Sequence, residues 1–141
     1  MKIFGLLIIL ASYTTISDIQ AVYKGQKEEE VLATLKMLES KRLLTADEQC
    51  YKAVFLCMKA DYLTWPTDKL EAFKNGYNDL NSIIAKYPTN AEYKYHRYMI
   101  EKFTPTWLIE VNHMEADKAY VKANLASSHP MHTFIAKTID K

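Results

Sequence analysis

The sequence predicts an all-α protein of five or six helices joined by short loops. Glycine and proline number only 3 and 4 in 141 residues, too few for the many tight turns of an all-β fold. Apolar residues also recur at spacings of three and four, between residues that typically begin or end helices. Hydrophobic residues make up 49% and charged residues 25%, as in globular domains, so the composition is not that of a disordered chain.

The N-terminus carries a candidate export signal. Lys2 is followed by an apolar run over residues 3–11. Nine residues of helix span about 14 Å, against about 30 Å of bilayer hydrocarbon, so this run is too short to cross a membrane. We therefore predict a secretory signal peptide over residues 1–21, with Ile19 and Ala21 at the positions that the peptidase inspects. Cleavage after Ser17 is an alternative, and a buried first helix of a cytosolic protein is another.

Export would place the mature chain, residues 22–141, in the periplasm or outside the cell. These residues contain no linker of low complexity, so we expect a single helical domain with no stable membrane span after cleavage. The net charge is +1 with no long block of one sign, which gives no reason to expect a nucleic-acid partner.

Two helices are expected in the first half. Residues 27–44 place their larger apolar residues near one face, with acids early and bases late, as the helix dipole favours. That face comprises Val31, Leu32, Leu35, Leu38 and Leu43. Thr45 and Glu48 then form a capping box that begins a helix running to about Leu63. This second helix is apolar on most sides, so it is expected at the centre of the fold.

Both cysteines, Cys50 and Cys57, fall in the second helix. Seven residues of helix rise about 10.5 Å, whereas a disulfide needs Cα atoms within about 7 Å. The two cannot bridge each other there, so we expect two buried thiols that pack as small apolar groups.

Two more helices follow at a Trp-Pro break. Pro66 ends the second helix, and Thr67 is expected to cap a third over residues 68–87. Its apolar stripe is Leu70, Phe73, Tyr77, Leu80 and Ile84. Asn90 is expected to cap a fourth helix over residues 91–103.

The C-terminal third is expected to form two helices. One runs from residue 105 or 106 to Leu125. The other is short and opens at residues 127–130, with Pro130 in its first turn.

Part of the third helix resembles a known repeat. Gly76, Leu80, Ile83 and the Pro88-Thr-Asn90 exit resemble the second half of a tetratricopeptide repeat. This resemblance implies helical hairpins stacked side by side, with an irregular helical bundle as the alternative.

A longer resemblance covers about residues 50–118. It rests on Tyr51-Lys-Ala53, Lys59-Ala60, Pro66 with Lys69-Leu70, Phe73 and Gly76, Pro88 with Asn90 and Glu92, Arg97 with Ile100-Glu101, Pro105 with Trp107-Leu108, and Asp117-Lys118. In these elements the chain resembles a family of small exported helical proteins of gram-negative bacteria that has no assigned activity. The resemblance implies a tetratricopeptide-like helical fold and no particular reaction.

Histidines and carboxylates supply the candidate metal ligands. Glu110, His113 and Asp117 would share one face of the predicted fifth helix, and Glu92 and His96 would share a face of the fourth. A di-iron site needs a second such unit and two more glutamates, and zinc needs three or four ligands that meet in space. We favour solvated helix faces and expect no cofactor.

No catalytic constellation stands out. The sequence has no G-x-S-x-G motif, and glycine is too scarce for a phosphate-binding loop. Tyr93, Tyr95 and Tyr98 alternate with basic residues as in single-strand binders, but their spacing is that of a core helix with a basic outer side. Whether the protein is an enzyme stays open, and a non-catalytic role is favoured.

Several charged residues lie beside the apolar stripes. Ionisable groups near a core are usually paired, so we expect Arg97 to pair with Asp117 or Glu101 and to tie the fourth helix to the fifth. The candidate binding residues are Lys69, Arg97, Glu101, Trp107, Asp117 and Lys118. The sequence thus favours an exported helical scaffold that binds a protein or peptide in the cell envelope. A periplasmic protein that binds a small ligand or metal without catalysis is the alternative.

Overall fold

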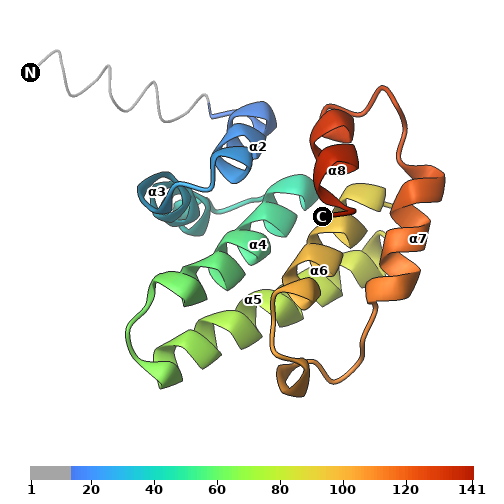
Figure 1. The fold of residues 1–141 in the computed structure, drawn as a ribbon. Coiled ribbons are helices and arrows are strands. Elements are labelled where there is room, and N and C mark those ends of the chain that lie inside the picture. Colours follow the sequence, from blue (N-terminus) through green and yellow to red (C-terminus); the bar gives the residue numbers. More distant parts are fainter. Residues whose placement is uncertain (1–13) are drawn as a thin grey trace, which may run out of the picture.

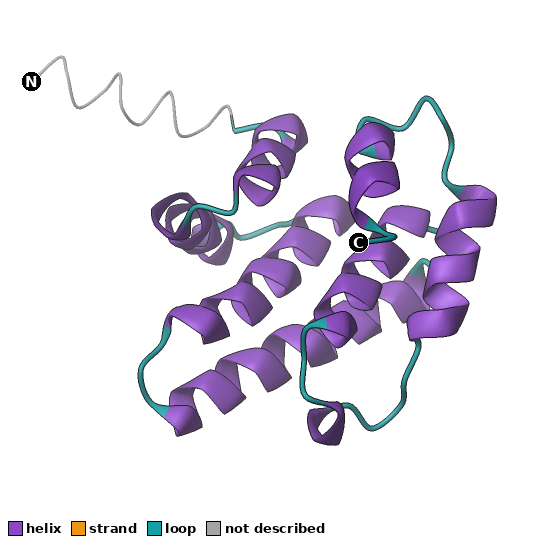
Figure 2. Cartoon of the chain, in the orientation of Figure 1, coloured by secondary structure: helices purple, strands orange, loops and turns teal. Residues whose placement is uncertain are grey.

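The computed structural model describes residues 14–141, and every regular element in this part of the chain is helical (Figures 1 and 2). The all-α prediction is therefore confirmed. Seven α-helices are present in this range, one more than the upper limit of the prediction. They are α2 (Ile16–Gly25), α3 (Glu28–Ser40), α4 (Ala46–Tyr62), α5 (Pro66–Lys86), α6 (Ala91–Lys102), α7 (Met114–Asn124) and α8 (His132–Thr138), with a 3-10 turn, η1 (Thr106–Leu108), between α6 and α7. The apolar run at residues 3–11 lies outside the described residues.

Helix α2 falls within the segment that the sequence assigned to a signal peptide. Thr15 begins it with a capping box, in which Thr15 and Asp18 exchange hydrogen bonds. Its inner face is buried in the core through Ile19, Gln20 and Tyr23. Ala21, the predicted cleavage position, lies in the middle of this helix. Cleavage there would separate two of these core residues from the rest of the domain.

The predicted caps of α4 and α6 are confirmed. Thr45 and Glu48 form the capping box of α4, and the Asn90 side chain accepts a hydrogen bond from the Tyr93 amide at the start of α6. The predicted cap of α5 is wrong, because α5 begins at Pro66 and Thr67 already lies inside it. Proline suits the first helical position, since that residue needs no amide hydrogen and the ring fixes φ near the helical value.

The predicted helix over residues 105–125 is also wrong in its first half. The chain forms η1, then an irregular segment, and enters α7 only at Met114. Leu43 lies beyond the end of α3 and is 88% exposed, so it does not belong to the apolar face predicted for residues 27–44. Helix α8 starts at His132, and Pro130 therefore precedes it rather than filling its first turn.

The α4–α5 hairpin forms the centre of the molecule (Figure 1). The two helices approach closely at Gly76, where an added Cβ would lie 2.7 Å from the Ala53 carbonyl oxygen. On one side α3 packs against α4, and on the other α6 packs against the hairpin and carries α7. The buried thiols are confirmed, since Cys50 and Cys57 are free and enclosed, and burial raises the pKa of both. Within residues 14–141, no helix is both long and apolar enough to cross a bilayer.

Candidate functional site

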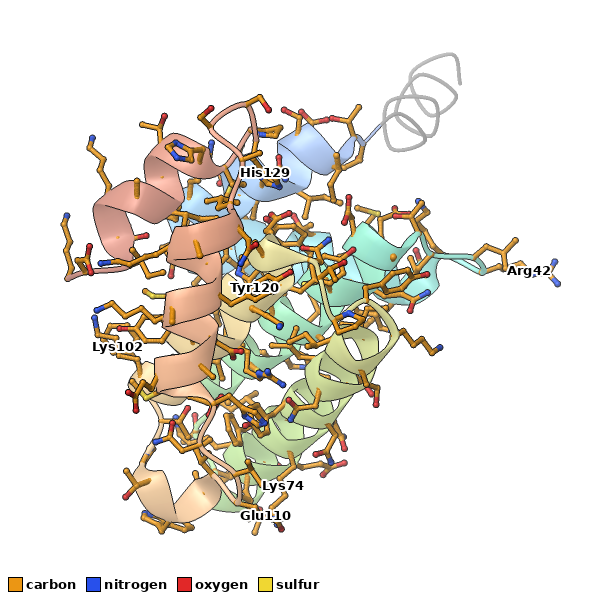
Figure 3. All side chains as sticks on the ribbon, turned by 90° about the vertical axis from the view of Figure 1, so that its right-hand side faces the viewer. Arg42, Lys74, Lys102, Glu110, Tyr120 and His129 are labelled. Atoms are coloured by element: carbon orange, nitrogen blue, oxygen red, sulfur yellow. The ribbon has the colours of Figure 1, made fainter. Side chains whose placement is uncertain are left out.

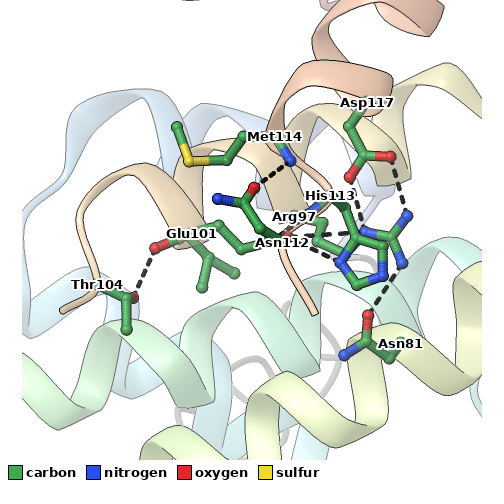
Figure 4. A network of polar contacts seen from close by, with 9 residues as sticks. Asn81, Arg97, Glu101, Thr104, Asn112, His113, Met114 and Asp117 are labelled. Atoms are coloured by element: carbon green, nitrogen blue, oxygen red, sulfur yellow. Dashed lines mark hydrogen bonds and ion pairs between the residues drawn. The ribbon is translucent and has the colours of Figure 1, made fainter. Parts of the chain in front are cut away.

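Arg97 forms a two-pronged ion pair with Asp117, as the sequence analysis expected. Its Nε donates to Asp117 Oδ2 at 2.7 Å and its Nη2 to Oδ1 at 2.9 Å, while Nη1 donates to Asn81 Oδ1 at 3.0 Å (Figure 4). Asp117 is buried, and only 11% of the Arg97 side chain is exposed. The pair joins α6 to α7, and the Asn81 bond adds α5 to the same contact.

Glu101, one turn further along α6, fixes the entry to α7. Its Oε1 accepts the backbone amide of His113 at 2.7 Å, and its Oε2 lies 3.2 Å from His113 Nδ1 (Figure 4). Arg97 Nε lies 4.0 Å from the same carboxylate. A buried carboxylate thus satisfies the backbone at the N-cap residue of α7, which has no side-chain cap of its own. We call Arg97, Glu101, His113 and Asp117 the α6–α7 network.

The chain between the two helices, residues 103–113, is called the connector. The middle of the connector is anchored to the protein, because Leu108 and Ile109 pack against the buried cluster of Cys57, Phe73 and Tyr77. At its start, the Thr104 hydroxyl donates to the Ile100 carbonyl oxygen at 2.6 Å. Anchors at its start, middle and end therefore fix the path of this irregular segment.

The connector directs three large apolar side chains toward solvent. Phe103 is 75% exposed, Trp107 79% and Val111 62%. Trp65, on the α4–α5 turn, is 68% exposed, and that turn lies at the same end of the molecule as η1 (Figure 1). We call Phe103, Trp107 and Val111 the connector surface. Contiguous exposed apolar patches mark interaction sites, so these three side chains are the candidates for such a site on this segment.

The two lysines among the predicted binding residues are engaged elsewhere. Lys69 Nζ donates to the Ala60 carbonyl oxygen at 3.1 Å, near the C-terminal end of α4. Lys118 Nζ lies 3.2 Å from Asp140, which Lys122 also contacts at 2.7 Å. Hydrogen bonds from Lys122 and Lys118 lower the pKa of the Asp140 carboxyl. Neither lysine lies in the α6–α7 network, so the structure does not assemble the six predicted residues into one cleft.

The predicted metal ligands do not converge either. His113 faces Glu101, and Asp117 is taken by Arg97. Glu110 precedes α7 and lies at the end of the molecule that carries Lys74, opposite His129 (Figure 3). Over the described part of the chain, no group of three or more histidine, cysteine, aspartate or glutamate side chains could hold a metal ion.

A second polar cluster, around Glu92, has partners that the sequence analysis did not identify. Glu92 is buried in the core, and its Oε2 accepts hydrogen bonds from the Tyr51 hydroxyl and, at 3.3 Å, from Gln20 Nε2. His96 Nε2 lies 3.7 Å from Oε2, and His129 Nε2 lies 3.5 Å from Oε1. The spacing of Glu92 and His96 was visible in the sequence. The other partners come from α2, α4 and the α7–α8 loop. They lie far from Glu92 in the sequence, so no local sequence pattern predicts these contacts.

Comparison with protein families, with curated proteins and with solved structures finds no match to this chain. Proposals about function therefore rest on the residues and contacts described above.

Proposed function

We propose that this protein is an exported helical scaffold that binds a protein or peptide partner in the cell envelope through its connector surface. The observation that carries the proposal is the exposure of Phe103, Trp107 and Val111 on a segment whose backbone is held in place. The envelope location rests on the predicted signal peptide, and cleavage after Ser17, the alternative position, would keep Ile19, Gln20 and Tyr23 in the domain. The α4–α5 hairpin supports the likeness to a tetratricopeptide-type scaffold, which presents side chains from stacked helical pairs.

Tryptophan and other aromatic side chains dominate the energetics of protein interfaces, because each buries a large area while losing little conformational freedom. Trp107 has most of its surface available for this purpose. The neighbouring Leu108 and Ile109 instead point into the protein, so the connector has an inner apolar face and an outer one. No part of the described chain covers the outer apolar face. Such a face lowers the solubility of the free protein, and a bound partner would shield it from water.

The α6–α7 network contributes to this function by fixing the connector in place rather than by touching the partner. Glu101 and Arg97 are largely buried and bonded within the protein, so they are not free to bind a ligand. They hold the end of the connector at His113, which limits the conformations open to Trp107. Preorganisation of this kind improves affinity by reducing the entropy lost on binding.

The test is crosslinking in the native envelope fraction, followed by affinity measurement with the partner recovered. Trp107→Ala is expected to weaken binding by about 2 kcal/mol, or about thirty-fold, as for an interface hot spot. Phe103→Ala should weaken it as well. Leu43→Ala is the matched control, since Leu43 is also exposed but lies in the α3–α4 loop. Failure to crosslink any partner, or equal affinities for Trp107→Ala and Leu43→Ala, would contradict the proposal.

A further inference from the structure

Two histidines share one buried carboxylate where α2, α4, α6 and the α7–α8 loop meet. His96 faces Oε2 of Glu92 and His129 faces Oε1, at 3.7 and 3.5 Å. Both described ion pairs of Glu92 are to imidazoles, and none is to lysine or arginine. The charge of this cluster therefore depends on how many protons the two imidazoles carry.

His96 is fully enclosed. Its side chain has no exposed surface, neither ring nitrogen makes a hydrogen bond, and the rings of Tyr23, Tyr51 and Tyr95 lie edge-on to it at 4.7, 4.9 and 5.3 Å. A cation in such surroundings needs the Glu92 carboxylate as its partner, since no solvent reaches it.

The hydroxyl and thiol groups around Glu92 stay uncharged in mild acid. Burial raises the pKa of Tyr23 in α2 and of Cys50 and Tyr51 in α4, and it is also the largest cause that raises the pKa of Tyr95 in α6. These four groups stay neutral. Tyr93 in α6 is also near enough to be influenced by Glu92, and burial is the largest cause that raises its pKa. Its hydroxyl donates a hydrogen bond to Asp47 in α4.

Glu92 itself stays ionised in the same range. Burial raises the pKa of its carboxyl, but the nearby His96 ring, with smaller contributions from the Tyr51 hydroxyl and His129, lowers it by more, and the net direction is down. A carboxyl whose pKa is lower in the folded state contributes stability that is lost only as the pH falls through that lowered value. Glu92 thus remains a carboxylate between two imidazoles, and histidine is in general the side chain whose charge changes near neutral pH.

His129 cannot accept a second proton without losing a bond. Its Nδ1 accepts the backbone amide of Met131 at 3.0 Å, at the N-cap of α8. Protonation at Nδ1 turns this acceptor into a donor that faces another donor. Its side chain is 28% exposed, so the charged ring can turn toward water, which His96 cannot do.

We infer that Glu92, His96 and His129 form an acid-sensitive latch that holds α8 against the core and releases it when both imidazoles are protonated. One imidazolium is balanced by the single carboxylate, whereas two leave a net positive charge in an enclosed site. His129 then leaves Glu92, and the Met131 amide loses its acceptor. Release of α8 uncovers the apolar side chains that it buries, Met131, Ile135 and Ile139, together with Tyr23 and Tyr95 beneath them.

Hydrogen exchange of the purified full chain, read by mass spectrometry and corrected for the chemical pH dependence of exchange, tests this inference. Between about pH 7.5 and about pH 5.5, protection over residues 126–141 should fall at least about ten-fold more than protection over α4. His129→Gln should abolish the difference, because glutamine gains no proton. His132→Gln is the matched control, since His132 lies in the same segment and forms no ion pair with Glu92 among the described contacts. It should behave as the wild type does.

An equal loss across all helices, no loss at all, or a loss that persists in His129→Gln would overturn the inference. If His129→Gln already releases α8 at neutral pH, this variant cannot test the inference. The test is then an NMR titration of the wild-type protein that follows its histidine ring protons as a function of pH. The latch then requires the His129 titration and the loss of α8 protection to share one midpoint. Two midpoints separated by more than about one pH unit would refute it.

Discussion

Loss of Arg97 is expected to destabilise the protein far more than loss of an ordinary surface base. Arg97→Leu removes two hydrogen bonds to Asp117 and one to Asn81, and it leaves the Asp117 carboxylate 2% exposed without a counter-ion. Breaking a buried pair by removing one partner costs about 3–5 kcal/mol, since the remaining charge stays uncompensated. For a domain of this size, that corresponds to a fall in the melting temperature of roughly 10–20 °C.

The assay is urea denaturation followed by circular dichroism, with midpoint and slope fitted together. Lys102→Leu is the matched control, because it removes a base from the same helix whose described contacts are with the rings of Tyr98 and Phe103. It should change the free energy of unfolding by less than about 1 kcal/mol. The double variant Arg97→Leu with Asp117→Leu should recover part of the loss, since no unpaired charge is left in the core.

The reasoning would be refuted by an Arg97→Leu midpoint equal to that of the wild type at an unchanged slope. It would also fail if the double variant lost as much as the two single changes added together. Additive losses would mean that Arg97 and Asp117 act independently, in spite of their distance of 2.7 Å.

Two further predictions concern the core. Gly76→Ala should cost about 1–3 kcal/mol in urea denaturation, because its Cβ would meet backbone atoms of Ala53 and Cys57 at 2.7 and 2.8 Å. Gly25→Ala, where the nearest atom is 3.9 Å away, should leave stability unchanged or slightly higher, and an equal loss at both sites would disprove the close-approach argument. A chain that begins at residue 22 lacks Ile19 and Gln20, so it should lose about 2–5 kcal/mol relative to residues 14–141. A truncated chain as stable as the longer one would show that α2 contributes little.

The helices could be predicted where their signals are local. The capping box at Thr45, the Asn90 cap and the stripe through Phe73, Tyr77 and Leu80 depend only on neighbouring residues, and each was predicted correctly. The apolar character of α4 on most of its sides likewise predicted correctly that it is the central helix.

The connector could not be predicted because its conformation depends on contacts made elsewhere. Residues 105–113 have no strong helix breaker after Pro105, so a continuous helix was the natural expectation. In the fold, the buried Glu101 accepts the His113 amide, and Ile109 packs against the α4–α5 hairpin. These tertiary contacts outweigh a weak local preference, which contributes only tenths of a kcal/mol per residue.

The candidate site likewise has one part that could be predicted from the sequence and one part that could not. The Arg97–Asp117 pair followed from charges placed next to apolar stripes, because such charges need partners. The partners of Glu92 did not follow, because Gln20 lies 72 residues away and within a segment assigned to a signal peptide. An assignment that removes α2 from the domain therefore removes one of the partners of Glu92, Gln20, and leaves the other three in place.

Helix α6 carries nearly all the ionisable groups that attach the C-terminal third to the rest of the protein. Glu92 faces His129, Arg97 faces Asp117, and Glu101 faces His113, so the three contacts lie in order along one helix. Polar contacts of this kind add little net stability compared with apolar packing, but they tolerate only one register of the partner segment. A shift of α7 by one residue would leave two buried carboxylates unpaired.

The three contacts also differ in how they respond to protons. The Arg97 guanidinium keeps its charge at every pH at which the protein folds, and the bond from the His113 backbone amide to Glu101 involves no imidazole proton. These two contacts should therefore persist while the α8 latch opens, so that mild acid alters the C-terminal helix and leaves the connector surface in place. Partner binding through Trp107 and release of α8 are accordingly expected to be independent. A change in Trp107-dependent affinity that follows the α8 midpoint would show that the two are coupled.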